Sequence, residues 1–106
     1  MAKYLFTGRY NTEGASGLIA DGGTGRRQAV EALAQSVGGS VESMHFALGK
    51  DDVFVIADLP DHQAATALAL TVAATGAVKI RTTPLLTPTD VDEAVKKSPA
   101  YRPPGG

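Results

Sequence analysis

The sequence predicts an α+β domain in which strands and helices follow the order βαββαβ, with a further helix at the C-terminal end. Two observations predict it. Short runs of β-branched and aromatic residues alternate with segments of helical periodicity. Two of these runs are joined only by Gly49-Lys50-Asp51, which is typical of a hairpin. The order is that of the ferredoxin-like fold, in which two helices cover one face of a four-stranded antiparallel sheet.

The N-terminal half predicts one strand and one helix. Residues 3–9 are rich in aromatic and β-favouring types, so they predict the first strand. Residues 11–25 are rich in glycine, and we expect a long irregular connection there, with a short helical turn at most. Apolar residues then recur at helical spacing over 30–37. They predict an amphipathic helix with Thr24 as its N-cap and Gly38-Gly39 as its end.

The next segments predict the hairpin. Residues 40–48 and 52–58 are rich in β-forming types on either side of the turn. Residues 53–57 are continuously apolar, which is typical of a central strand covered on both faces.

The second helix and the fourth strand follow. Pro60-Asp61 opens a helix that continues to about Thr75 and ends at Gly76. Residues 77–83 predict the fourth strand, and we expect Pro84 to stop it.

A short helix and a tail end the chain. Thr87 is expected to cap a helix that extends to Lys97, with Pro88 at its first position and Asp90 completing a capping box. Residues 98–106 are rich in proline and glycine and are expected to be extended or disordered. The predicted organisation is a domain over residues 1–97 and a tail over 98–106.

Composition limits the classes of function. The chain has 106 residues, a net charge of −1 and no cysteine. At this net charge neither a basic nucleic-acid-binding surface nor a polybasic membrane patch is expected, so we expect no nucleic-acid or membrane partner. Disulfides and thiol chemistry are excluded because there is no cysteine. We expect a soluble cytoplasmic protein.

Both faces of the predicted sheet are apolar. Tyr4 and Phe6 alternate with Leu5 and Thr7 along the first strand, and the third strand is apolar on both sides. The helix over residues 60–75 is apolar almost all the way round. Two helices can cover only one face, so we expect a homo-oligomer that buries the sheet face and this helix. The alternative is a monomer in which the tail or the long connection covers the second face.

Several segments resemble the GYD domain family of small prokaryotic proteins. They read KYLFTGRY over 3–10, RRQAVE over 26–31, GKDDVFVI over 49–56, DLPD over 58–61 and RTTPLLT over 81–87. The resemblance covers roughly residues 3–97. The family's name refers to Gly, Tyr and Asp near the hairpin, and this sequence has Gly49 and Asp52, with Asp51 where the Tyr is expected.

The resemblance implies an assembly but no defined activity. The family is similar to the dimeric α+β barrel group, in which two ferredoxin-like protomers pack their sheets to form a barrel. Wider relatives include cofactor-independent oxygenases, haem-binding enzymes, muconolactone-type isomerases and ligand-sensing modules. Fold analogy does not select among these.

A glycine-rich segment followed by two arginines is a candidate anion site. Residues 22–25 read GGTG and precede Arg26 and Arg27 at the start of the predicted helix. Backbone N–H groups at a helix start, together with guanidinium groups, can bind an anion. Alternatively, the glycines serve turns and the arginines form surface or interface ion pairs.

His45 is a candidate base near neutral pH. By strand alternation it is expected to share a face with Ser43 and Val41. Four further polar residues are expected at strand ends, where they could converge on a cavity: Arg9, Tyr10, Asp52 and Arg81. Alternatively, His45 is a hydrogen-bonded interface residue.

The remaining titratable residues suggest no metal or cofactor. His62 is expected to be exposed to solvent, and neither histidine has a ligand at metal-binding spacing. Asp51 is expected in a solvated turn, whereas Asp52 could pair with an arginine.

Three functions therefore remain open. The first is a binding module for an apolar or anionic small molecule, acting as a homo-oligomer. The second is a cofactor-independent oxygenase or isomerase, with His45 as base and Arg9, Arg26 or Arg81 holding an enolate or carboxylate. The third is a structural subunit that assembles through its second helix and its tail.

Overall fold

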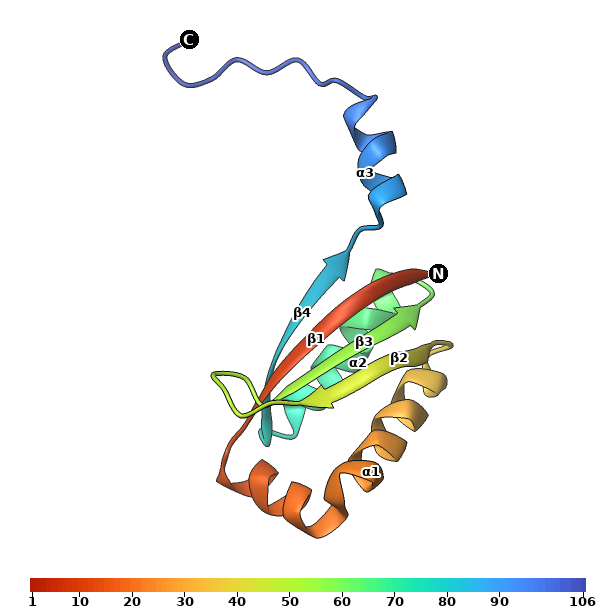
Figure 1. The fold of residues 1–106 in the computed structure, drawn as a ribbon, viewed down its shortest axis with the longest axis vertical. Coiled ribbons are helices and arrows are strands. Elements are labelled where there is room, and N and C mark those ends of the chain that lie inside the picture. The colour runs from red at the N-terminus through yellow and green to blue at the C-terminus, as the bar shows by residue number, and fades with distance from the viewer.

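The computed structural model describes residues 1–106 and has the predicted element order (Figure 1). The elements are β1 (Ala2–Tyr10), α1 (Thr12–Ser36), β2 (Ser40–Phe46), β3 (Val53–Leu59), α2 (His62–Ala74), β4 (Val78–Leu85) and α3 (Pro88–Val95). The four strands form one antiparallel sheet in the order β2-β3-β1-β4. The predicted α+β class and the ferredoxin-like arrangement are confirmed.

The core lies between one face of the sheet and helices α1 and α2. Alternate residues of β1 and β3 point into it, and they include Tyr4, Phe6, Val55 and Leu59. The helices contribute few fully buried side chains, mainly Ala34 from α1 and Ala65 and Leu68 from α2. The core is therefore built mostly by the sheet. None of the helices has both the length and the apolar content needed to cross a membrane.

The glycine-rich segment over 11–25 is helical, so the prediction of an irregular connection was wrong. The Asn11 side chain caps α1 by accepting a hydrogen bond of 2.8 Å from the Gly14 N–H, and Thr24 is not the cap. Gly22, with φ of 74° and ψ of 167°, kinks the helix instead of ending it. Gly14 is needed for a close approach, because a Cβ there would lie 2.3 Å from the Ala77 carbonyl oxygen.

The predicted C-terminal end of α1 is confirmed. Gly38 adopts a φ of 85°, and its N–H donates to the Gln35 carbonyl. The Gly39 N–H donates to the Ala34 carbonyl at 2.9 Å. These two bonds form a Schellman motif, which satisfies the last carbonyls of the helix.

The β2–β3 connection is longer than the tight turn predicted at 49–51. The strands end at Phe46 and resume at Val53, and the Ala47 N–H donates to the Asp52 carbonyl at 2.8 Å. A bulge between Val41 and Ser43 also shifts the register of β2. Val41 therefore faces the helices, whereas Ser43 and His45 face the opposite side of the sheet.

β4 does not stop at Pro84. Pro84 pairs with Tyr4, and the strand continues to Leu85. A proline is tolerated here because β4 is an edge strand, where one row of backbone groups needs no partner.

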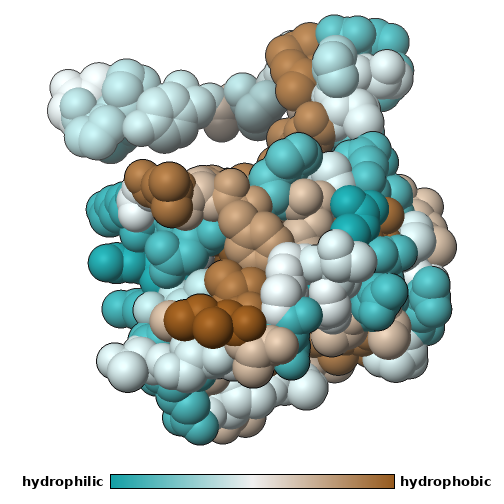
Figure 2. Space-filling model, turned by 60° about the horizontal axis from the view of Figure 1, so that its bottom comes forward, coloured by the Kyte–Doolittle hydropathy of each residue, from teal (hydrophilic) through white to brown (hydrophobic).

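The C-terminal arm, residues 86–106, stands away from the domain (Figures 1 and 2). Helix α3 begins with the predicted capping box between Thr87 and Asp90, with hydrogen bonds of 3.0 and 2.9 Å. None of its residues is buried, and no regular structure follows it. The arm exposes several apolar side chains, namely Leu86, Val91, Val95 and Tyr101.

No helix covers the second face of the sheet, which we call the open face. Leu5 and Ile56 are neighbours on it and are half-buried, and Phe54 is 37% exposed. Around this apolar strip lie polar residues, including Lys3, whose ammonium group pairs with Glu42 at 2.8 Å and Asp58 at 2.9 Å. The predicted alternation of β1 and β3 is confirmed.

Candidate functional site

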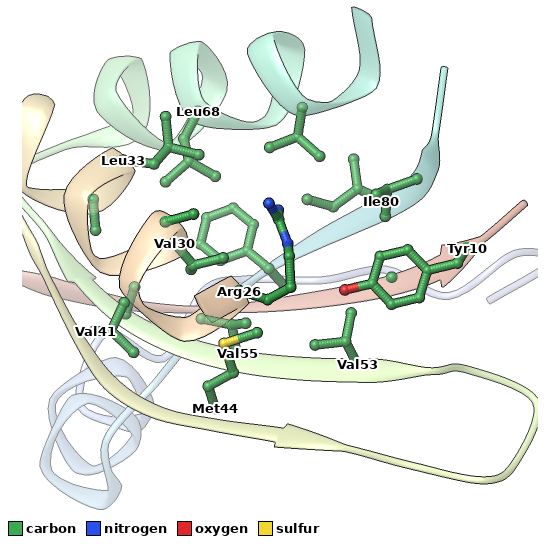
Figure 3. A pocket seen from close by; sticks show the side chains of 17 residues that line it. Tyr10, Arg26, Val30, Leu33, Val41, Met44, Val53, Val55, Leu68 and Ile80 are labelled. Atoms are coloured by element: carbon green, nitrogen blue, oxygen red, sulfur yellow. The ribbon is translucent and has the colours of Figure 1, made fainter. Parts of the chain in front are cut away.

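An apolar cavity of about 100 Å³ lies between the helix-facing side of the sheet and helices α1 and α2 (Figure 3). All four strands and both helices contribute to it, and apart from Gly8, Tyr10 and Arg26 every residue that lines it is hydrophobic. Its larger lining side chains are Phe6, Val30, Leu33, Met44, Val55, Leu68 and Ile80. Because such a lining offers no hydrogen bonds, the interior suits an apolar group.

Two polar side chains line the cavity: Arg26 from α1 and Tyr10 from the end of β1. Figure 3 shows both directed into the same space. The only carboxylate paired with Arg26 is that of Asp21, whose Oδ2 lies 3.5 Å from Arg26 Nη1 across the kink at Gly22. Since 3.5 Å is longer than a strong charge-assisted hydrogen bond, the guanidinium group keeps donors free for another anion.

Tyr10 is held in place by Asp52. The Tyr10 N–H donates to Asp52 Oδ2 at 2.8 Å, and the Asp52 N–H donates to the Gly8 carbonyl at 2.8 Å. Burial has the largest effect and raises the pKa of the Tyr10 phenol, the neighbouring Arg26 guanidinium lowers it, and the charge of Asp52 raises it to a smaller extent. The phenol is therefore neutral at physiological pH and can donate a hydrogen bond.

A wider hollow of about 480 Å³ adjoins the cavity. It lies between the first half of α1 and the end of α2, and it shares Tyr10, Arg26, Leu33, Val72 and Val78 with the cavity. The two polar side chains therefore stand where the open hollow meets the enclosed apolar space. This arrangement can bind an anionic group at its mouth while burying an apolar group inside.

The two arginines of the candidate anion site, which follow the glycine-rich segment, lie in different surroundings. Arg26 turns into the cavity, whereas Arg27 donates from Nε to Glu31 Oε1 at 3.1 Å on the helix surface. The glycines of 22–25 lie inside α1 and at its kink and do not form an N-terminal loop. One of the two predicted arginines thus lies at the cavity.

The four predicted strand-end residues do not converge. Tyr10 lines the cavity and Asp52 holds it, but Arg9 and Arg81 lie on the open face. The two aspartates have other partners than expected. Asp51, expected in a solvated turn, pairs with Arg81 at 3.0 Å, and Asp52 accepts from a backbone N–H instead of an arginine.

His45 lies on the open face, opposite Phe54 of β3. Arg26 is on the other side of the sheet. Arg81 is in the same row of the sheet but three strands away, which is about 14 Å at the usual spacing of ~4.8 Å. A single chain therefore does not bring His45 together with either arginine.

One polar pair was missed by sequence reasoning. The Tyr4 hydroxyl, in a residue only 2% exposed, forms a hydrogen bond of 2.7 Å with His62 Nδ1. His62 is exposed as predicted, but it also satisfies this buried phenol. The two residues are 58 positions apart, so no local pattern could indicate the contact.

The fold and the cavity together define the class of protein to which this chain belongs. The chain is a ferredoxin-like α+β domain with an apolar cavity between its sheet and its helices. The family model of the GYD domain matches residues 4–95, and the chain belongs to that family. No curated protein and no solved structure matches it. No three His, Cys, Asp or Glu side chains lie close enough together to bind a metal ion.

Proposed function

We propose that this chain is a cytoplasmic binding module for a compact molecule with an apolar body and a carboxylate or similar anionic group. The observation that carries the proposal is the apolar cavity with one cation and one neutral phenol at its mouth. The apolar body would occupy the cavity, the anionic group would pair with Arg26, and the Tyr10 hydroxyl would donate to it.

The dimensions favour a small body. The cavity measures about 100 Å³, and a dry cavity of about 150 Å³ in another protein binds benzene. A short branched chain is therefore the largest group that fits inside, and a single ring fits only by extending partly into the adjoining hollow past Arg26. Anything larger would extend into the adjoining hollow past Arg26.

The module is proposed to act as a homo-oligomer that buries the open face. Leu5, Phe54 and Ile56 form an apolar strip there without a helix above it. A second copy carries the same strip, so a two-fold arrangement would bury both strips at once. The pairing of sheets in the dimeric α+β barrel group, which the family resembles, supports the same occupant. The proposal includes the predicted contact between copies through α2, because the Leu70 side chain on this helix is 64% exposed.

Benzoate is a suitable probe for the cavity, and adjacent arginines provide a matched pair of variants. Arg26→Met removes the cation at the mouth, and Arg27→Met removes one that pairs with Glu31 on the surface. Calorimetric titration is expected to show binding to the native chain, a loss of about tenfold or more in Arg26→Met, and little change in Arg27→Met. Equal affinity in both variants, or no binding to the native chain, would contradict the proposal.

The oligomer has its own test. Phe54→Lys places a charge in the apolar strip, whereas Leu48→Lys places the same charge on the fully exposed β2–β3 loop. Native mass spectrometry is expected to show a multimer for the native chain and for Leu48→Lys, and a monomer for Phe54→Lys. A native chain that is monomeric at micromolar concentration would remove this part of the proposal and leave the cavity unaffected.

A further inference from the structure

A second cationic site lies on the open face, across the sheet from the cavity. It is a hollow of about 150 Å³ lined by Arg9, Lys50, Asp51, Lys79 and Arg81. Four cationic side chains meet there with one carboxylate. The whole chain, in contrast, carries 10 basic and 11 acidic residues, so the positive charge is concentrated at this corner of the sheet.

The sheet and the hairpin loop bring these cations together. Arg9 of β1 and Lys79 of β4 are directly opposite each other in the antiparallel register, which places their Cβ atoms about 5 Å apart. Arg81 follows two positions along β4 and therefore points to the same face. Lys50 reaches the hollow from the β2–β3 loop.

Most of this charge has no partner within the chain. Arg81 pairs with Asp51, whose side chain is 14% exposed, at 3.0 Å. Arg9, Lys50 and Lys79 form no salt bridge and no side-chain hydrogen bond with any residue of the chain. Like charges directly across two strands destabilise a sheet, and neither Arg9 nor Lys79 has a carboxylate paired with it. An anion that binds here would reduce the repulsion between Arg9 and Lys79. It would also pair with three cationic side chains that have no partner within the chain.

We propose that this hollow binds a multiply charged phosphate anion, of the diphosphate class. A single carboxylate would neutralise one of the three unmatched cations, whereas a diphosphate can engage all three. Arg9 offers a planar guanidinium group for two parallel hydrogen bonds to phosphate oxygens, and the two lysines act as point charges. Asp51 holds Arg81 at the edge of the hollow, which limits how far the positive field extends.

This site is independent of the cavity. Arg26 and Tyr10 lie on the helix side of the sheet, and Arg9 and Lys79 on the other. The hollow borders the apolar strip: Arg81 shares a row of the sheet with Phe54, whereas Arg9 and Lys79 lie farther along, near the end of β1 and the start of β4. Failure of the benzoate experiment would therefore say nothing about the phosphate site, and the reverse also holds.

Sodium pyrophosphate is the probe, in calorimetric titrations at low and moderate salt. Lys79→Gln removes one unmatched cation, and Lys97→Gln makes the same charge change after α3, outside the hollow. Lys79→Gln is expected to weaken pyrophosphate binding about tenfold and to reduce its salt dependence, while Lys97→Gln stays within about twofold of the native chain. Inorganic phosphate is expected to bind more weakly than pyrophosphate.

Thermal unfolding provides a second measurement. Pyrophosphate is expected to raise the melting temperature of the native chain and of Lys97→Gln, and to raise that of Lys79→Gln much less. Lys79→Gln should fold well without the anion, because it removes the repulsion with Arg9. Equal weakening by both substitutions, or no binding at low salt, would overturn the proposal. So would a change in oligomeric state, instead of affinity, in Lys79→Gln, because the hollow would then be a contact between copies.

Discussion

Single glycine positions in α1 serve different physical needs, although the sequence presents them as one glycine-rich run. Gly14 is buried against the connection between α2 and β4, where a Cβ would approach the Ala77 carbonyl oxygen to 2.3 Å and the Tyr10 ring to 2.9 Å. Gly17 has nothing within 4 Å of its Cβ position. Packing therefore requires glycine at position 14, whereas position 17 can accommodate a residue with a higher helix propensity.

Gly14→Ala is therefore expected to destabilise the fold by about 2 kcal/mol or more, because the new methyl group would force backbone to move. Gly17→Ala is expected to stabilise it by up to about 1 kcal/mol through helix propensity. Urea unfolding of both variants measures the difference. A neutral Gly14→Ala would mean that the start of α1 does not pack on Ala77 and Tyr10 as described.

The Tyr10 phenol makes stability depend on alkaline pH. Its pKa is raised in the folded chain, chiefly by burial, so the unfolded chain releases this proton first as the pH rises. From about pH 10, the ordinary pKa of tyrosine, the folded state therefore holds more protons and the free energy of unfolding falls with pH. Below that pH the phenol is neutral in both states and contributes no pH dependence.

Tyr10→Phe is expected to remove this contribution. Urea midpoints of the native chain and the variant should run parallel up to about pH 9 and converge or cross above about pH 10, since only the native chain carries this titration. The other tyrosines and the lysines titrate in both proteins and cancel in the comparison. A difference that stays constant across this range would show that the phenol is as accessible in the folded chain as in the unfolded one.

The two arginines show why the residues at the cavity were only partly predictable. Arg26 and Arg27 are neighbours, and which one turns inward depends on the phase of the helix after the kink at Gly22. The sequence predicts the arginines as a pair but contains no signal for that phase. Asp51 and Asp52 also depart from their expected roles, because the loop is longer than the tight turn that was predicted: Asp51 pairs with Arg81, and Asp52 accepts from the Tyr10 N–H.

At the scale of elements, the kink of α1 places Arg26 at the cavity. Gly22 has φ of 74° and ψ of 167°, a region essentially limited to glycine. The kink leaves Asp21 and Arg26 on its two sides and 3.5 Å apart at their charged groups. Gly25 lies after the kink, where a Cβ would make only an ordinary contact of 3.5 Å with Asp21.

Gly22→Ala is expected to cost about 1–3 kcal/mol, entirely through backbone strain, because no atom lies within 4 Å of its Cβ position. If α1 instead straightens in the variant, the loss of stability is smaller, but Arg26 moves away from the cavity. Benzoate binding is then weaker. Gly25→Ala is the control and should be neutral or slightly stabilising. A fully stable Gly22→Ala variant with unchanged benzoate affinity would contradict the role given to this kink.

Two element boundaries that rest on local chemistry were predicted, the local cap of α1 at Asn11 was missed, and boundaries that rest on tertiary contacts were not predicted. The capping box at Thr87 and the end of α1 at Gly38 involve bonds between residues close in sequence, and both are confirmed. Pro84 was expected to stop β4, but whether a strand tolerates proline depends on its place at a sheet edge. The bulge after Val41 likewise depends on pairing with β3 and has no signature in β2 alone.

At the scale of the whole molecule, the sheet separates two differently charged environments. One face, with α1 and α2, encloses the apolar cavity, and the other carries the apolar strip and the cationic hollow. The sequence predicted that both faces would be apolar but not that positive charge would gather at one corner. That corner combines residues from β1, β4 and the β2–β3 loop, and only the observed register joins them.

The C-terminal arm is attached to this domain without packing on it. α3 has no buried residue and takes no part in the main contacts between elements, and residues 96–106 are all exposed. Removal of residues 86–106 is therefore expected to change the free energy of unfolding of the domain by less than about 1 kcal/mol, since little apolar surface is lost. Urea midpoints of the full chain and of residues 1–85 measure this directly.

Thr87→Ala in the full chain separates the stability of the arm from that of the domain. It removes the capping box of α3, which costs that helix about 1 kcal/mol, so helical content should fall slightly while the urea midpoint stays unchanged. A midpoint that drops in both the truncated chain and Thr87→Ala would mean that the arm packs on apolar surface in solution. Its exposed Leu86, Val91 and Val95 would then be the side chains to substitute next, because they are the arm's main apolar groups.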